Sequence, residues 1–499
     1  MKMVAQPVLE VHNVVKTYGG VHALKKVSIS LIPGEVHCLA GENGSGKSTL
    51  IKIISGVEKP DSGTITIGGK ERSQLTPNEA IRSGVQVIYQ DFSLFPNLTA
   101  AENIAMLSEL ADGRKLSSRK RIYADADQIV TELGLKIDLG ADVGSLSVAD
   151  RQLVAICRAL VGEAKVLIMD EPTTALTHTE IDRLFTIVRR LQERGVAVMF
   201  VSHKLDEVLQ ISQHLTILRN GELVETGPSS DYTRRSIAKA MTGREVSEDR
   251  LLEPLDANAP LLLEVKNLTR SGDFTNIDLS LRRGEILGIT GLLGSGRSEI
   301  AEAIFGIRPA ESGEVIVAGQ AHKIGSIRDA VKAGIGYVPE DRLTQGLFLD
   351  ISIADNMVAS SLDSYRTRFG LLDRVRIRKS IADLFKRLRI QAPNVTAFVR
   401  SLSGGNAQRV VLAKWLDRQP SILVLNGPTV GVDIGSKEEI LAILREQAAA
   451  GMGIIIISDD IPELVSSCHR VLIVHEGRIA SELVGDDIHT DEISKRLAA

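Results

Sequence analysis

The chain has 499 residues, which predicts two to four domains, and its 43% hydrophobic and 24% charged residues are typical of soluble globular proteins. A formal net charge of −4 argues against broad binding to nucleic acid. We expect no signal peptide and no transmembrane helix, because no apolar run approaches roughly 20 residues. Cys38, Cys157 and Cys468 are far apart, which indicates reduced thiols in a cytosolic protein.

One long pattern occurs twice along the chain. Residues 8–69 align with residues 263–319, and Gly34-Glu35 matches Gly284-Glu285. A repeat of this length is far above the roughly 20–50 residues of solenoid repeats, so it predicts two homologous domains in tandem. We assign the first domain to residues 1–245, a polar linker to residues 246–260 and the second domain to residues 261–499.

Each copy has the same order of predicted elements. Alternating apolar stretches, such as "LEVHNVV" and "GTITIGG", predict an antiparallel sheet, and the apolar strand "EVHCLA" leads through a Gly-rich turn into a helix, "KSTLIKIISGV". The middle of each copy, about residues 95–160 and 350–418, is helical in pattern. The last part alternates apolar strands with helices, which predicts a parallel sheet and an α/β fold.

Residues 41–48, "GENGSGKS", fit the phosphate-binding pattern G-x-x-x-x-G-K-[ST] between a strand and a helix. Glycines let backbone N–H groups face phosphate oxygens, and the helix N-terminus adds a positive dipole end. We expect Lys47 to contact the β- and γ-phosphates and Ser48 to ligate Mg²⁺. The alternative, a Gly-rich turn without function, is disfavoured by this context. The predicted loop comprises Gly41, Glu42, Asn43, Gly44, Ser45, Gly46, Lys47, Ser48 and Thr49.

Two acids and a histidine follow later apolar strands. The strand "VLIMD" ends at Asp170, which would hold Mg²⁺ through water, and Glu171 could take a proton from an attacking water. His203 follows the strand "VMFVS", at the sheet edge where ligands collect, and we expect it to contact the γ-phosphate. The structural alternatives are an acidic helix cap and a packed histidine, and the order of the motifs favours the functional interpretation.

The second copy has lost these groups but keeps a different motif. At the positions of Lys47, Asp170, Glu171 and His203 it has Arg297, Asn426, Gly427 and Asp459, whereas Ser48 is matched by Ser298. A planar guanidinium does not replace a compact ammonium, an asparagine lacks the charge that Mg²⁺ prefers, and a glycine cannot accept a proton. Conversely, residues 402–406 read "LSGGN", whereas residues 146–150 of the first copy read "LSVAD".

These motifs resemble those of ATP-binding cassette (ABC) ATPases. The tandem arrangement and the segments "GYVPEDRLTQGL" (336–347) and "LSGGNAQRVVLAKWL" (402–416) resemble the ATP-binding subunits of bacterial monosaccharide importers of the ribose, galactose and xylose type. The resemblance covers essentially the whole chain. It implies two P-loop NTPase cassettes, each with a RecA-like parallel-sheet core, an antiparallel β-subdomain and a helical subdomain, with ATP and Mg²⁺ as ligands.

The resemblance also implies that the cassettes pair head to tail, with each ATP between the phosphate loop of one and the LSGGQ-type signature of the other. An intact site would combine the first cassette's Tyr18, Lys47, Ser48, Gln90, Asp170, Glu171 and His203 with Ser403, Gly404, Gly405 and Asn406. Within it Gln90 would help to bind Mg²⁺ and Tyr18 would stack on adenine, although a tyrosine in a sheet can also simply pack. A degenerate site would combine Gly291, Gly294, Gly296, Arg297, Ser298, Glu340, Asn426, Gly427 and Asp459 with Ser147, Val148, Ala149 and Asp150.

The function implied by the resemblance is the motor subunit of a carbohydrate or polyol importer, peripheral to the cytoplasmic face of the membrane. Its expected partners are transmembrane permease subunits, which would dock near Gln90 and Glu340, and a periplasmic or lipid-anchored solute-binding protein. Specificity would lie in those partners.

Other functions are less consistent with the sequence. A soluble tandem cassette of the ABC-F type, acting on ribosomes, is disfavoured by the short linker and the one-sided losses, and a stand-alone regulatory ATPase is a further alternative. The basic stretch 366–390 does not indicate nucleic-acid binding, because Ile377, Ile381, Leu384 and Leu388 recur at the spacing of an amphipathic helix.

Overall fold

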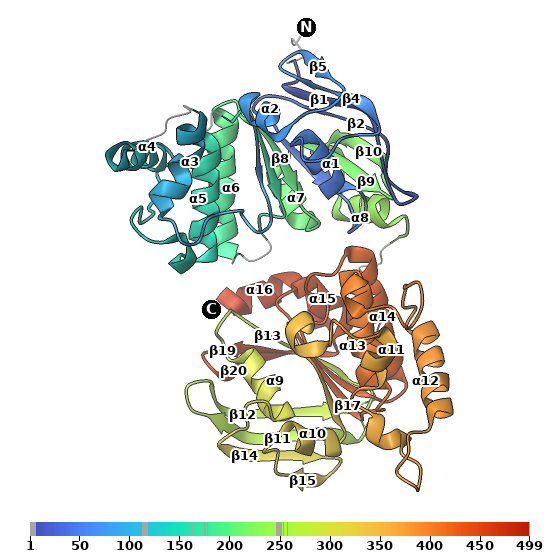
Figure 1. Cartoon of the computed structure of the whole chain (residues 1–499). Helices are drawn as coiled ribbons and strands as arrows, with labels where there is room; N and C mark the ends of the chain where they lie inside the picture. The colour runs from blue at the N-terminus through green and yellow to red at the C-terminus, as the bar shows by residue number, and fades with distance from the viewer. Residues whose placement is uncertain are drawn as a thin grey trace. The chain divides into compact units, whose positions relative to one another are not determined.

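The structure is a computed structural model that describes residues 6–111, 118–161, 164–173, 176, 178–245, 252, 254–256 and 258–498 (Figure 1). The chain divides into two compact units, Met1–Val246 and Ser247–Ala499. Among the described residues, no helix combines the length and the hydropathy needed to cross a membrane.

The first unit contains a small antiparallel sheet, a larger mixed sheet and helices on both sides of the larger one (Figure 1). Its strands are β1 (Leu9–Tyr18), β2 (Val21–Leu31), β3 (Val36–Ala40), β4 (Ser62–Ile67), β5 (Lys70–Arg72), β6 (Val85–Ile88), β7 (Val166–Asp170), β8 (Ala197–Val201), β9 (His214–Arg219) and β10 (Glu222–Pro228). Its helices are α1 (Lys47–Ile54), α2 (Pro77–Arg82), α3 (Ala100–Ala111), α4 (Arg119–Glu132), α5 (Val148–Val161), α6 (His178–Glu193), α7 (Leu205–Ile211) and α8 (Arg234–Thr242).

The strand orders are β2-β1-β4-β5 in the antiparallel sheet and β10-β9-β3-β8-β7-β6 in the mixed one. The mixed sheet is parallel from β9 to β6, and only β10 runs antiparallel to its neighbour. Strands β7 and β8 are therefore adjacent, and their carboxyl ends lie at the same edge. This adjacency matters for the site, because Asp170 ends β7 and His203 follows β8.

Both faces of the mixed sheet are covered, which explains why its strands read as continuous apolar runs. Along β7, Val166 and Ile168 belong to the core shared with α1 and the antiparallel sheet, whereas Leu167 and Met169 belong to the core shared with α3, α4, α5 and α6. The side chains of a strand alternate between faces, so one short strand joins both cores.

The second unit repeats this plan, with the strand orders β12-β11-β14-β15 and β16-β17-β18-β13-β19-β20. Its strands are β11 (Leu261–Arg270), β12 (Phe274–Arg282), β13 (Ile286–Gly291), β14 (Ser312–Val317), β15 (Gln320–His322), β16 (Ile335–Val338), β17 (Ile422–Asn426), β18 (Gly453–Ile457), β19 (Arg470–His475) and β20 (Arg478–Val484). Its helices are α9 (Arg297–Phe305), α10 (Ile327–Lys332), α11 (Ile353–Val358), α12 (Arg374–Arg387), α13 (Gly404–Leu416), α14 (Ile434–Ala449), α15 (Ile461–Ser467) and α16 (Thr490–Ala498).

The basic stretch forms the amphipathic helix α12, as predicted, although the helix is shorter than residues 366–390. It begins at Arg374 because the Asp373 carboxylate accepts hydrogen bonds from the N–H groups of Val375 and Arg376. Ile381 and Leu384, together with Leu388 just beyond the helix, are buried in the core of the unit.

Candidate active site

The loop from Gly41 to Gly46 joins the end of β3 to the start of α1, as the sequence predicts. Gly46 caps the helix with φ +107°, and a Cβ there would lie 2.5 Å from the carbonyl oxygen of Ala23, so a larger residue would not fit. The buried Lys47 folds back over the loop, and its Nζ atom donates to the carbonyl oxygens of Gly41 at 2.6 Å and Glu42 at 2.9 Å. Burial lowers the pKa of Lys47, while Glu171 and Asp170 oppose that shift.

Glu171 and His203 lie together at the ends of β7 and β8. The Nδ1 atom of His203 is 3.0 Å from the Oε1 atom of Glu171, although the residues are 32 positions apart. Burial, and then the charge of Glu171, raise the pKa of the neighbouring Asp170, whereas Lys47 lowers it. The Lys47 ammonium, the Asp170 and Glu171 carboxylates and the His203 imidazole therefore lie at one partly buried edge of the sheet.

The backbone at Glu171 adopts a conformation that non-glycine residues rarely use. Its φ is +48°, and its N–H donates to the carbonyl oxygen of Val201 at 2.9 Å. The matching residue of the second unit, Gly427, has φ +58° and donates to Ile457 at 2.8 Å. The second unit thus keeps the turn and carries there the one residue that adopts it without strain.

Three further residues predicted for the first unit, Ser48, Gln90 and Tyr18, lie on its surface. Gln90 and Ser48 are exposed. Tyr18 ends β1 with 41% of its surface exposed, and its ring is 5.2 Å from the Nζ atom of Lys16. The ring of Tyr18 is therefore partly accessible to solvent.

In the second unit, Arg297 occupies the position of Lys47 and bonds the equivalent glycine carbonyl, but it also has an acidic partner. Its Nη1 atom donates to the carbonyl oxygen of Gly291 at 2.5 Å, and its Nη2 atom lies 3.7 Å from the Oδ2 atom of Asp459, the residue at the histidine position. The guanidinium and the carboxylate thus bridge the two positions, where the first unit has an amine and an imidazole.

A cavity of about 430 Å³ lies beside Asn426 in the second unit. Its lining residues are Ser298, Glu302, Tyr337, Glu340, Asp341, Gln345, Asn426 and Val430. Burial raises the pKa of Tyr337 to about 12, with a hydrogen bond to Asn426 acting in the opposite direction. Asn426 takes the position that Asp170 has in the first unit, so a neutral amide replaces the carboxylate there. Its amide oxygen is 3.5 Å from the Ser298 hydroxyl.

The signature residues of the second unit form the start of α13. Ser403 precedes the helix and is exposed, and its hydroxyl oxygen accepts a hydrogen bond from the Asn406 side chain at 3.0 Å. A Cβ on Gly404 would lie 2.7 Å from the carbonyl oxygen of Gly431, and one on Gly405 would lie 2.4 Å from the Ser436 hydroxyl. Both glycines are therefore required by local packing.

The first unit departs from this geometry. Val148 and Ala149 replace the glycines at the start of α5, and the Ser147 hydroxyl donates to the Asp150 carboxylate at 2.8 Å. The hydroxyl proton of Ser147 is thus engaged by a charged acceptor beside the helix start, whereas Ser403 accepts from a neutral amide.

Sequence reasoning did not single out one buried group near the pair. Glu207, on α7, accepts hydrogen bonds from Thr173 and Ser202, which flank Glu171 and His203 along the chain. The internal repeat could have pointed to Glu207. Thr173, Ser202 and Glu207 recur in the second copy as Thr429, Ser458 and Glu463, each the same number of residues further along the chain.

A family model described as "ABC transporter" matches residues 24–174 and 274–430, once in each unit. The chain belongs to the ABC transporter family. The matches confirm the predicted resemblance and the fold of two tandem cassettes. Members of this family bind ATP, normally with Mg²⁺, and the chain is an ATPase of this family.

Relatives match this ABC protein over almost its whole length. It is 41% identical over 487 residues to "Ribose import ATP-binding protein RbsA 2" of Burkholderia cenocepacia, covering 97% of this chain and 96% of the relative. It is 42% identical over 477 residues to the protein of the same name from Streptomyces avermitilis, covering 96% and 94%. These full-length matches do not favour the alternative of an ABC-F protein.

A solved structure shares the two-cassette fold. The structure described as "Model of ribosome-bound archaeal Pelota and ABCE1" matches 97% of this chain and 80% of that chain, with a TM-score of 0.64 and 20% identity. At this identity the likeness concerns the fold alone.

The donors near Asp170 fit a magnesium ion. Mg²⁺ prefers oxygen ligands and usually combines one or two carboxylates with water and substrate phosphates. Asp170 supplies a carboxylate beside Lys47 and Glu171, and Ser48 and Gln90 carry exposed oxygen donors on the same unit. Among the described residues, no group of three or more His, Cys, Asp or Glu side chains could hold a metal by itself.

Proposed function

We propose that this chain is the ATP-hydrolysing subunit of a carbohydrate importer, and that only the site built on the first cassette hydrolyses ATP at an appreciable rate. The observation that carries the proposal is the contact of Glu171 with His203, together with the absence of both residue types from the matching positions of the second cassette. The names of the full-length relatives support import of a monosaccharide such as ribose.

The residues of the first cassette have separate tasks. Lys47 turns its ammonium from the loop carbonyls to the β- and γ-phosphates, while Ser48, Asp170 and Gln90 hold Mg²⁺, which neutralises phosphate charge when bound. Glu171 accepts a proton from the attacking water. His203 contacts the γ-phosphate and, through its Nδ1 atom, holds the Glu171 carboxylate in place.

The signature of the second cassette completes this site in our proposal. The helix α13 would direct its N-terminal N–H groups and the Ser403 hydroxyl to the γ-phosphate, with Gly404, Gly405 and Asn406 shaping the helix start. The distribution of losses supports this pairing, because the first cassette retains its phosphate loop and lacks the signature, and the second shows the reverse. Tyr18 would stack on the adenine, which its exposed ring allows.

The degenerate site would use the second cassette's Gly291, Gly294, Gly296, Arg297 and Ser298 with the altered signature of the first. In this site Arg297 replaces the ammonium, and its partner Asp459 replaces the switch imidazole. The neutral Asn426 replaces the metal-binding carboxylate, and Glu340, which also lines the cavity, replaces the amide of Gln90. Gly427 has no side chain to act as a base, so slow or absent turnover is expected there.

The transport function requires partners that are not part of this chain. Transmembrane permease subunits would provide the path and dock near Gln90 and Glu340, so that the subunit works as a peripheral protein at the cytoplasmic face. A periplasmic or lipid-anchored solute-binding protein would deliver the cargo. Nucleic acid is not among the expected partners.

Reconstitution tests the proposal directly. The chain and its permease are assembled in lipid vesicles, and uptake of labelled ribose and other pentoses is measured with ATP supplied on the side of this chain. We expect uptake that requires ATP and is lost in Glu171→Gln. Sedimentation of the chain with ribosomes, combined with failure to associate with the permease, would contradict the importer function.

A further inference from the structure

We propose that Glu207 is a positioning residue for ATP hydrolysis, because its buried carboxylate ties together the two loops that carry Glu171 and His203. The inference rests on the proposed function of the first cassette and adds to it a residue that touches neither the nucleotide nor the water.

One oxygen of Glu207 connects the two loops. The Thr173 hydroxyl donates to Glu207 Oε2 at 2.6 Å, and the Ser202 hydroxyl donates to the same atom at 3.1 Å. Thr173 stands two residues after Glu171, and Ser202 immediately precedes His203. Each loop is therefore hydrogen-bonded to the same Glu207 oxygen at a residue one or two positions from its reactive side chain.

A lysine completes the clamp formed by Glu207, Thr173, Ser202 and Lys204. The Lys204 Nζ atom lies 3.2 Å from Glu207 Oε1 and donates at 3.2 Å to the carbonyl oxygen of Thr173. The backbone N–H of Lys204 also donates to the Ser202 hydroxyl at 3.0 Å. The cation thus binds both the carboxylate and the loop after β7.

Burial makes this arrangement stiff. Thr173 and Ser202 are each 2% exposed and Glu207 is 6% exposed. A buried carboxylate is costly unless it is well hydrogen-bonded, so the departure of either loop would remove one donor from Glu207 at a cost in free energy. The contact of 3.0 Å between Glu171 and His203 depends on the spacing of these loops, and a shift of about 1 Å in a reacting geometry can cost about 100-fold in rate.

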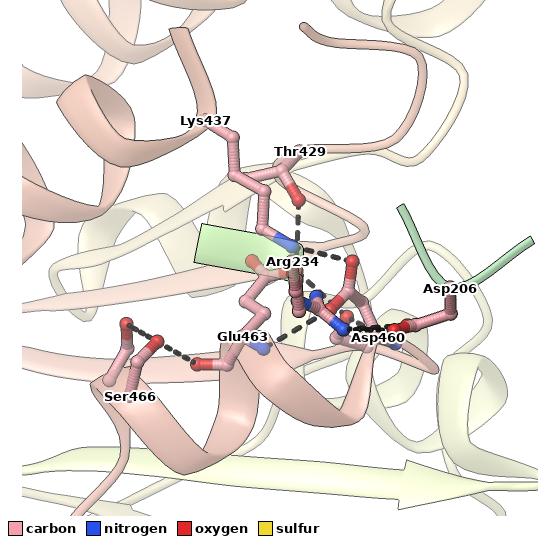
Figure 2. A network of polar contacts seen from close by, with 9 residues as sticks. Asp206, Arg234, Thr429, Lys437, Asp460, Glu463 and Ser466 are labelled. Carbon is pink, nitrogen blue, oxygen red and sulfur yellow. Dashed lines mark hydrogen bonds and ion pairs between the residues drawn. The ribbon is translucent and has the colours of Figure 1, made fainter. Parts of the chain in front are cut away.

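The second unit repeats the carboxylate and the two hydroxyls of this clamp, but it has an aspartate in place of the lysine and lacks the reactive pair; Figure 2 shows Thr429 and Glu463. Thr429 and Ser458 each donate to Glu463 Oε2 at 2.9 Å. Asp460 stands at the position of Lys204, and its Oδ2 atom lies 2.5 Å from the Nζ atom of Lys437. Glu463 is 1% exposed. The clamp therefore serves the fold in both units, and only in the first does it also set the distance between a carboxylate and an imidazole. This repetition provides a matched control within one chain.

The test compares Glu207→Ala with Glu463→Ala in the full chain assembled with its permease. For each variant we measure kcat and KM for ATP, the binding of a fluorescent ATP analogue and the melting temperature. We expect Glu207→Ala to lower kcat about 10- to 100-fold with KM within about twofold, and Glu463→Ala to leave kcat within about twofold. Glu207→Gln restores an acceptor oxygen of the same reach and should recover most of the lost kcat.

An isosteric pair covers the case in which Glu207→Ala does not fold. Thr173→Val removes one hydrogen bond to the carboxylate with almost no change of volume, and Thr429→Val is its control. We expect about a fivefold or larger loss of kcat from Thr173→Val alone. Equal effects of Thr173→Val and Thr429→Val on kcat, or full kcat in Thr173→Val, would overturn the positioning role.

Glu171→Gln, measured in parallel, separates this inference from the proposed function. If Glu171→Gln retains turnover, the function proposed for the first cassette fails. If Glu171→Gln loses turnover while folded Glu207→Ala and Thr173→Val retain it, only the clamp inference fails.

Discussion

The Nδ1 atom of His203 lies 3.0 Å from the Oε1 atom of Glu171, a contact between side chains that follow two adjacent parallel strands. Since a carboxylate only accepts, the hydrogen bond places the proton on Nδ1 of the imidazole. The second unit has a glycine and an aspartate at these positions, and there Asp459 pairs with Arg297 instead. The two units share a backbone and differ in the chemistry that it carries.

Glu171→Gln should keep ATP binding and lose hydrolysis. The amide retains the shape of the side chain but cannot accept a proton, and losing such a base costs about 10²–10⁴ in rate. The measurement is steady-state turnover in assembled transporter, with binding of a fluorescent ATP analogue as control. Turnover above roughly a tenth of the wild-type rate would contradict the assignment of Glu171 as the base.

Lys47→Ala and Arg297→Ala should differ in their effect on turnover. The first removes the ammonium of the site proposed to hydrolyse ATP, whereas the second removes a guanidinium that is paired with Asp459. We expect Lys47→Ala to abolish most activity and Arg297→Ala to leave much of it, measured with the permease present. Equal losses in the two variants would mean that both sites contribute to hydrolysis.

Ser403→Ala and Ser147→Ala test the proposed pairing of cassettes. Both serines are exposed at the start of a helix, so neither change should disturb packing. The steric fit of Gly404 makes any larger residue there a poor probe, since its Cβ would lie 2.7 Å from a carbonyl oxygen. Loss of one hydrogen bond to a charged group is worth about 1.5–3 kcal/mol, so Ser403→Ala should lower turnover about tenfold or more.

In the same experiment Ser147→Ala should have little effect on turnover. If each signature served its own cassette, the result would be reversed, and Ser147→Ala would be the damaging change. Melting temperatures of both variants establish that the comparison is made at equal folded fraction.

Gly427→Ala should destabilise the second cassette through backbone strain, whereas Glu171→Ala should add no such strain to the first and cost only the contacts of the lost side chain. The alanine at 427 would adopt φ +58° and place its Cβ 2.8 Å from a Val430 methyl carbon, a combination that costs about 1–3 kcal/mol. At Glu171 a side chain already occupies φ +48°, so truncation adds no new backbone strain. Calorimetry of the two variants measures both effects, and an unchanged transition in Gly427→Ala would contradict the requirement for glycine.

The stability of the second cassette should fall as the pH rises from about 4.5 to about 7. Burial raises the pKa of Glu463 from 4.5 to about 7, while Lys437 acts in the opposite direction. Within this window the folded state binds more protons than the unfolded state, so the free energy of unfolding decreases with increasing pH. Glu463→Gln should flatten this dependence, as measured by the melting temperature at a series of pH values, and an unchanged slope would contradict the shift.

Several features of the molecule could be predicted from the sequence because they depend on local patterns. The phosphate loop needs a strand, glycines, a lysine and a helix in one short stretch, so residues 41–48 were recognisable directly. The amphipathic spacing of residues 377–388 predicted a helix, and the observed helix, which begins after the Asp373 cap and ends at Arg387, is shorter at both ends than the stretch 366–390.

The one-sided loss of motif residues was also visible in the sequence, since Arg297, Asn426, Gly427 and Asp459 are changes of residue type that need no coordinates. The contacts of these residues were decided by the tertiary structure. The Glu171–His203 and Arg297–Asp459 contacts join positions far apart along the chain, and they form because the strands and loops that carry them are neighbours at one edge of each sheet. In the sequence, Glu207 looks like an acid on a surface helix. Its role as a buried acceptor depends on how α7 packs against the loops that follow β7 and β8, and packing of that kind is set by the whole core and not by the adjacent residues in the sequence.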